Sequence, residues 1–165
     1  MTQRVVVRRA RRRDLETIMG IMNSSRWLDK PITENEALIR LAQKGYWLAI
    51  SRVGAALAGW QAENLVTCVD DLFVYPPNGA DWLGPPLLAE VESAAKQLEC
   101  EICAVLVPAR GQAQLDPMLV SCGYRSCRLG QLDRIWQEVL AQSGPGPETS
   151  IWVKQIRAER VIMPI

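Results

Sequence analysis

The sequence predicts an α/β (α+β) protein with a mixed central sheet of about seven strands flanked by helices. Strand-like runs and amphipathic helical segments follow one another in the order β, α, α, β, β, β, α, β, α, β, with an extra helix before a final strand. Three consecutive strands in the middle predict an antiparallel meander, whereas a later apolar strand between helices is predicted to be central and buried. Together these patterns predict a mixed sheet.

A strand is predicted at residues 4–8, where consecutive valines favour extended backbone. Asp14 stands where it can cap a helix whose apolar residues recur at helical spacing. Thr33 and Glu36 form a capping-box pattern ahead of a second helix, and Gly45 follows at the position of a C-terminal glycine. One strand and two helices are therefore expected in this part of the chain.

The next two strand-like runs, "YWLAISRV" and "AALAGWQAEN", are separated by Val53 and Gly54 and predict an antiparallel hairpin. The run "LVTCVDDLFVY" continues it as a third strand. A glycine-bearing loop follows, and after it a helix with one apolar stripe. Pro85 and Pro86 are expected in the first turn of this helix, where the missing N–H groups are tolerated.

The C-terminal part begins with "EICAVLV", a continuous apolar run typical of a buried central strand. A short helix is predicted around 115–120, and "YRSCRL" predicts another strand. An extra amphipathic helix is expected at about 131–142. A flexible linker at 143–150 precedes the last strand, "IWVKQI", and the chain 1–165 is expected to form a single domain.

Composition excludes several classes of protein. With 19 Lys and Arg against 18 Asp and Glu, the net charge of +1 offers no field that favours nucleic acid. No segment is apolar over the length of a membrane span and none resembles a secretory leader, so a cytoplasmic protein is expected. The chain has no histidine, which excludes Ser-His-Asp and Cys-His catalysis. Its five cysteines are expected to be reduced thiols, and their spacing predicts no metal site.

One stretch carries a resemblance to a known family. The run "VDDLFVYP" feeds a glycine-bearing turn and a helix with Leu87 and Leu88, and Cys122-Gly123-Tyr124 closes the following helix. In this order and spacing the chain resembles the GNAT superfamily of N-acetyltransferases over nearly its whole length. The resemblance implies the GNAT acyl-CoA N-acyltransferase fold. It also implies acetyl-CoA as co-substrate and, as acceptor, a primary amine of unknown identity on a small molecule or a protein.

The resemblance implies where acetyl-CoA would lie. In the family it occupies a V-shaped opening between two parallel central strands, expected here at residues 65–75 and 101–107. Main-chain groups of Leu72, Phe73 and Val74 would pair with the pantetheine arm. The pyrophosphate would lie on the turn and helix N-terminus that follow, formed here by Gly79, Ala80, Asp81, Trp82, Leu83 and Gly84.

This turn departs from the family pattern. When Gly84 is aligned with the last motif glycine, Gly79 stands where the family has Arg or Gln, and Trp82 stands where it has a glycine. Asp81 adds a negative charge beside the anion site, and the two prolines after Gly84 have no N–H to donate. Weakened or rearranged binding of acetyl-CoA is therefore expected.

The resemblance also directs attention to candidates for proton transfer. The tyrosine that often serves the family as general acid falls on Leu119, and Tyr124 and Tyr75 are the nearest substitutes in the sequence. For Tyr124, a packing aromatic is the favoured alternative. Asp70 and Asp71 are candidate bases for the acceptor amine, and strand alternation predicts that they point to opposite faces of the sheet.

Three residues are candidates for binding the acceptor: Trp27, Trp60 and Glu63, with core packing of the indoles and a solvated carboxylate as the alternatives. Trp136, on the extra helix, is a candidate contact in a homodimer. Two functions stay open. One is an acetyl-CoA-dependent N-acetyltransferase. The other is a catalytically degenerate GNAT-fold protein that acts as a ligand-binding or protein-interaction module.

Overall fold

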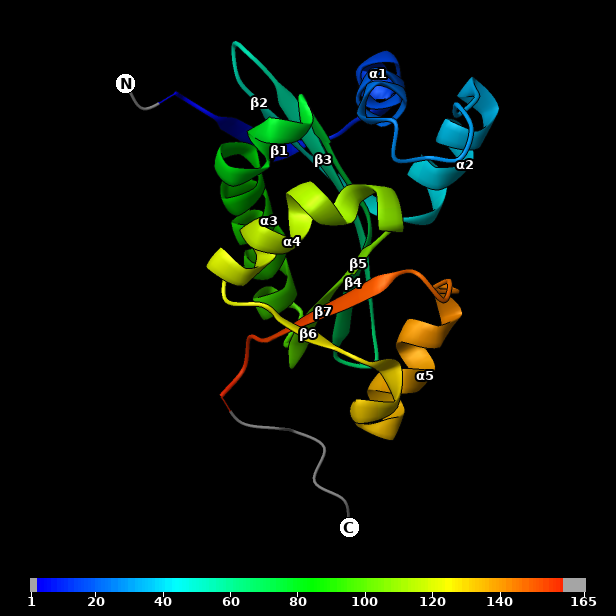
Figure 1. Ribbon diagram of the computed structural model, residues 1–165, viewed down its shortest axis with the longest axis vertical. Coiled ribbons are helices and arrows are strands. Elements are labelled where there is room, and N and C mark those ends of the chain that lie inside the picture. The colour runs from blue at the N-terminus through cyan, green and yellow to red at the C-terminus, as the bar shows by residue number, and fades with distance from the viewer. Residues whose placement is uncertain (1–2, 159–165) are drawn as a thin grey trace.

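The computed structural model of the protein describes residues 3–158, which form a seven-stranded mixed sheet packed with five helices (Figure 1). The strand order is β1-β2-β3-β4-β5-β7-β6, parallel between β4 and β5 and antiparallel elsewhere. The strands are β1 (Val6–Arg9), β2 (Gly45–Ile50), β3 (Ala55–Glu63), β4 (Val66–Tyr75), β5 (Ile102–Val107), β6 (Arg125–Cys127) and β7 (Ser150–Gln155). The helices are α1 (Leu15–Ser25), α2 (Glu34–Gln43), α3 (Ala80–Gln97), α4 (Gln112–Ser121) and α5 (Arg134–Gln142). The predicted fold class is confirmed.

The predicted N-cap hydrogen bonds form at α2 but not at α1. α2 begins after Thr33, whose side chain accepts the Glu36 N–H at 3.3 Å, while the Glu36 carboxylate accepts the Thr33 N–H at 2.9 Å. Asp14 occupies the N-cap position of α1, but its carboxylate pairs with Arg8 at 2.7 Å instead of capping the helix. Gly45 begins β2 and does not end α2, because the chain leaves α2 in an extended conformation that needs no glycine.

The start of α3 also differs from the prediction. A 3₁₀ turn, Pro77–Gly79, leads directly into the helix at Ala80, so Pro85 and Pro86 lie in its second turn and not in its first. Paired prolines usually mark a first turn, because a missing N–H is harmless there. Here burial of Leu83 holds the preceding turn against the core and extends the helix toward the N-terminus.

A shared pattern leads from each of the two parallel strands into its helix. Residues 76–85, after β4, and residues 108–117, after β5, both read Pro-x-x-Gly-x-x-x-Leu-x-Pro. In each case the first proline precedes a 3₁₀ turn, the glycine is the N-cap of the helix and the leucine is buried in the core. The two turns therefore have the same construction and lie where β4 and β5 end.

α5 covers the part of the sheet formed by β4, β5 and β7. Its apolar side packs with Leu106 and Ile151 in a cluster separate from the main core. Trp136 belongs to this cluster and is buried, so little of its indole is left for a second chain. This burial favours a core-packing role for the indole, and the predicted dimer contact of Trp136 stays a prediction.

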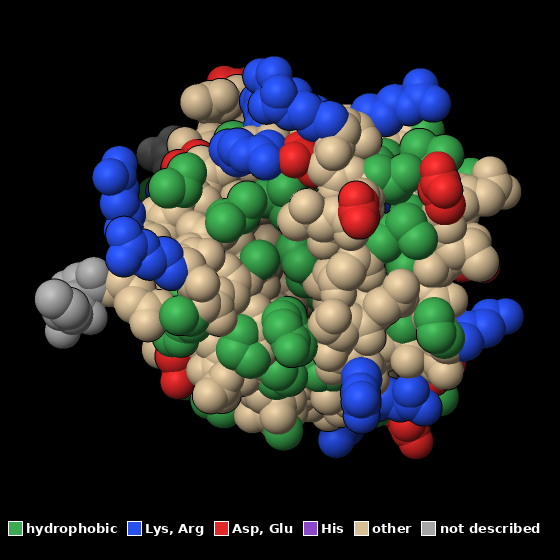
Figure 2. Space-filling view, turned by 90° about the horizontal axis from the view of Figure 1, so that it is seen from above, with side chains coloured by type: hydrophobic (Ala, Val, Ile, Leu, Met, Phe, Trp, Pro, Cys, Tyr) green, Lys and Arg blue, Asp and Glu red, His purple; other side chains and the backbone are tan. Residues whose placement is uncertain are grey.

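The surface of the molecule seen from above, after a turn of 90° from Figure 1, carries both charged and apolar side chains. Figure 2 shows Lys and Arg side chains in separate groups toward its rim, with apolar side chains nearer the centre. Within the part of the chain that the structure describes, no helix combines the length and the hydropathy needed to cross a bilayer.

Candidate functional site

β4 and β5 separate part of the way along β4. They pair in parallel only from Val66 to Val69 on β4 and from Ile102 to Val105 on β5. β4 continues to Tyr75, so its edge beyond Val69 has no partner on β5. A cavity of about 370 Å³ opens at this point between the α1–α2 loop, α2, β4, the end of β5 and the segment before β7.

A β-bulge in β4 presents two successive carboxylates to this cavity. β3 pairs Gly59 with Asp71 and Trp60 with Val69, so Asp70 is an extra residue on β4 without a counterpart on β3. A bulge shifts the alternation of side chains by one residue. Asp70 and Asp71 both line the cavity, and the prediction that they point to opposite faces is wrong because it assumed a regular strand.

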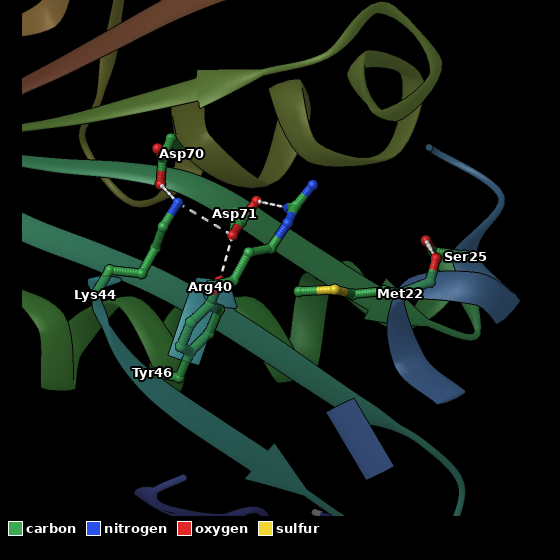
Figure 3. A network of polar contacts seen from close by, with 7 residues as sticks. All are labelled: Met22, Ser25, Arg40, Lys44, Tyr46, Asp70 and Asp71. Carbon is green, nitrogen blue, oxygen red and sulfur yellow. Dashed lines mark hydrogen bonds and ion pairs between the residues drawn. The ribbon is translucent and has the colours of Figure 1, made fainter. Parts of the chain in front are cut away.

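Asp71 is the centre of a polar network (Figure 3). Arg40 Nη1 donates to one carboxylate oxygen at 2.6 Å and the Tyr46 hydroxyl donates to the other at 2.5 Å. Lys44 Nζ lies 3.2 Å from Asp71 Oδ2 and 2.7 Å from Asp70 Oδ1. Burial, reinforced by the charge of Asp71, raises the pKa of Tyr46 above its ordinary value, so the phenol stays protonated and donates.

The two carboxylates differ in how fully they are compensated. The Asp71 side chain is 6% exposed and has three partners, whereas that of Asp70 is 18% exposed. Among residues 3–158, the polar partner of Asp70 is Lys44, which binds one of its two oxygens. Asp71 is therefore suited to hold the network in place, and Asp70 to meet a ligand in the cavity.

Sequence reasoning missed Arg40, Lys44 and Tyr46. The spacing of Arg40 and Lys44, four residues apart at the end of a predicted helix, would place both on one side. The spacing does not indicate which carboxylates the two cations would pair with. Tyr46 lies opposite Gly59 and reaches Asp71 across β3, a relation that depends on the pairing of three strands.

Gly59 provides the space for this crossing. A Cβ atom at this position would lie 2.5 Å from the Tyr46 ring and 2.9 Å from Asp71 Cβ. Gly59→Ala is expected to lower the free energy of unfolding by about 2–3 kcal/mol, because the ring must leave its place beside Asp71. Urea denaturation measures the change.

Gly20→Ala in α1 is the matched control, since no heavy atom lies within 4 Å of the added Cβ. This substitution is expected to raise the free energy of unfolding by about 0.5–1 kcal/mol through helix propensity. Equal effects of the two substitutions would contradict the packing described at Gly59.

Several predicted site residues meet at the cavity. Trp27, Leu72 and Phe73 line it, and the Trp27 indole stacks on Phe73 with 6.3 Å between ring centroids. Val74 is buried in the main core instead. Glu63 lines a neighbouring cavity of about 470 Å³ that shares lining residues with the first one, namely Lys44, Asp70 and Ser143.

Trp60 and Tyr124 lie elsewhere. Trp60 packs its indole beside Gly45 and lines a different, shallow depression. Tyr124 is buried, and its hydroxyl donates at 2.9 Å to Glu92, which also pairs with Lys154 at 3.0 Å. Burial raises the pKa of Tyr124 far above its ordinary value. Of its two open interpretations, the structure matches that of a packing aromatic.

The turn before α3 has few N–H groups free for an anion. Gly79 N–H donates to the Pro76 carbonyl at 2.8 Å, and Ala80 N–H is also used within the 3₁₀ turn. From Leu83 onward, the N–H groups of α3 point to carbonyls four residues earlier. Only the two residues between remain, and one is Asp81, whose carboxylate repels an anion. These residues fit a pyrophosphate poorly.

No protein-family model matches the sequence, and no curated protein matches it. Many solved structures do match. A GNAT-family acetyltransferase from Staphylococcus aureus Mu50 aligns over 93% of this chain and 100% of its own, with a TM-score of 0.71 and 14% identity.

Two further matches were solved with ligands. The phosphinothricin acetyltransferase from Sinorhizobium meliloti, in complex with acetyl-CoA, has a TM-score of 0.68 and 14% identity over 100% of this chain and 94% of its own. The PaiA N-acetyltransferase from Thermoplasma acidophilum, in complex with coenzyme A, has a TM-score of 0.65 and 14% identity over 92% of this chain and 99% of its own. At such identities the likeness shows the fold. The chain has the GNAT fold, as its sequence predicts.

Proposed function

We propose that this GNAT-fold protein transfers an acyl group, acetyl from acetyl-CoA in the first instance, to a primary amine on a small molecule or a protein. The observation that carries the proposal is the cavity at the separation of β4 and β5, where Asp70 lies beside the unpaired edge of β4. A thioester and an amine would meet there. The solved relatives named above, two of them with coenzyme A or acetyl-CoA, support the same reaction class.

The reaction needs a place for the thioester and an acceptor for one proton. Main-chain groups of Leu72 and Phe73 are the candidate partners of the donor, and an N–H there would stabilise the oxyanion. The amine nitrogen attacks the acyl carbon, the amide bond forms and the C–S bond breaks. The proton of the amine passes to Asp70, directly or through water, and the thiolate takes a proton from water.

The charges around the cavity suit an acceptor that arrives as a neutral amine. Asp70 and Asp71 are balanced by Arg40 and Lys44, all four within one network. A bound ammonium ion would add a third cation beside two carboxylates, whereas a neutral amine needs no further counter-charge. Loss of the proton before attack is also a requirement of the chemistry.

A second candidate function is a non-catalytic ligand-binding or protein-interaction module. The hydrogen bonds of the turn before α3 favour it, because they occupy the N–H groups that would bind a pyrophosphate. Leu119 favours it as well, since it stands where the family often has its general acid and is fully buried.

Calorimetry with acetyl-CoA, followed by mass spectrometry of an amine panel, tests the two candidates. For the transferase we expect saturable binding and an amine product heavier by one acetyl group, formed only when protein and acetyl-CoA are both present. Absence of binding at millimolar acetyl-CoA would reject the transferase and leave the interaction module.

A further inference from the structure

We infer that the acyl donor is recognised through its pantetheine arm and not through its pyrophosphate, so that thioesters of pantetheine serve whether or not they carry the nucleotide. The inference rests on the proposed acyl transfer. It concerns which part of the donor the protein binds, and therefore which class of thioester it accepts.

The first argument is the hydrogen bonding of the turn before α3. A helix N-terminus binds a phosphate through several converging N–H groups that have no other acceptor. Here the 3₁₀ turn uses the N–H groups of Gly79 and Ala80, and the helix uses those from Leu83 onward. Opening the 3₁₀ turn to bind an anion would break two hydrogen bonds that already exist.

The second argument is the charge at this helix end. The N-terminus of α3 carries a partial positive charge that attracts an anion, and Asp81 in the first turn already supplies one. The corresponding turn after β5, Ala109–Gly111, does not add a free cation. Its Arg110 donates to the Leu28 carbonyl at 2.9 Å and lies 3.4 Å from Asp29, which turns the guanidinium toward the α1–α2 loop.

The third argument is the packing behind the turn. α3 and α4 touch where Gly84 meets Met118, so closely that an added Cβ would lie 2.8 Å from the Met118 sulfur. This contact closes the space between the two helices at that level. The thioester end of a donor keeps its site, because no residue that lines the cavity beside β4 belongs to the turn Pro77–Gly79 or to α3.

Comparing coenzyme A with pantetheine by calorimetry tests the inference. The two dissociation constants are expected to differ by less than about tenfold, whereas two or three charge-assisted hydrogen bonds to a pyrophosphate would separate them by about a hundredfold or more. The affinity for coenzyme A is also expected to change little between low and high salt. A preference for coenzyme A above about tenfold overturns the inference and leaves the proposed function standing.

Asp81→Asn gives an independent result, because this side chain is exposed and the loss of its charge at the helix N-terminus costs too little stability to unfold the protein. If no phosphate lies at the turn, Asp81→Asn and the control Glu90→Gln, an exposed carboxylate farther along α3, leave both affinities unchanged. If Asp81→Asn strengthens binding of coenzyme A but not of pantetheine, a phosphate does lie there and the inference is wrong. Absence of binding by either ligand rejects the proposed function, and the inference with it.

Discussion

Replacing Asp71 with asparagine is expected to lower the free energy of unfolding by about 3 kcal/mol, a large share of the stability of an ordinary domain. The carboxylate compensates Arg40 and Lys44 and accepts the Tyr46 hydroxyl. The Lys44 side chain is only 9% exposed, so water replaces the lost charge poorly. Asparagine keeps the shape of the side chain, which confines the change to its charge and hydrogen bonds.

Urea denaturation of the purified variant measures this loss. Tyr46→Phe is the matched control, because it removes one donor to the same carboxylate without removing a charge, and we expect a loss of about 1 kcal/mol. The double variant should lose less than the sum of the two single losses, since both act on one network. If Asp71→Asn lowers the free energy of unfolding no more than Tyr46→Phe does, Arg40 and Lys44 do not need Asp71 as a counter-charge.

Replacing Asp70 with asparagine is expected to slow acyl transfer about a hundredfold or more, because the amine loses its proton acceptor. The effect on stability should be smaller than for Asp71. Asp70 is more exposed, has Lys44 as its polar partner among residues 3–158 and stands outside the pairing of β3 with β4. Steady-state kinetics with an amine found in the panel, together with urea denaturation, separates the two effects.

Asp29→Asn is the control for this variant. Asp29 lines the same cavity, but its side chain is 97% exposed at the mouth. The same change from carboxylate to amide there is expected to alter the rate by less than about twofold, as is usual for solvated surface charges. Equal losses of rate for the two variants would show that the general charge of the cavity matters and that Asp70 has no special role.

Much of the fold was predictable because its signals are local. The capping pair Thr33 and Glu36 lies within the first turn of α2, and the apolar run of β5 is continuous in the sequence. Each signal depends on residues within a few positions of one another. The helices, strands and their order follow from such signals, and the match with the GNAT fold follows from the order.

The candidate site was only partly predictable. Asp70, Asp71 and Trp27 were identified from their place in the chain, and all three line the cavity. Their relation was predicted wrongly, since the bulge that presents both carboxylates exists only when β3 pairs with β4. Lys44 was missed because its partners are 26 residues and more away.

The order of the elements and the absence of histidine chemistry could be read from the amino-acid sequence, because they depend on residue type and on spacing along the chain. The start of α3, the side of the sheet to which Asp70 points and the cation beside it became clear only from the folded chain. Those features depend on strand register and on packing across the sheet. A buried leucine or one unpaired residue changes them without altering any local pattern.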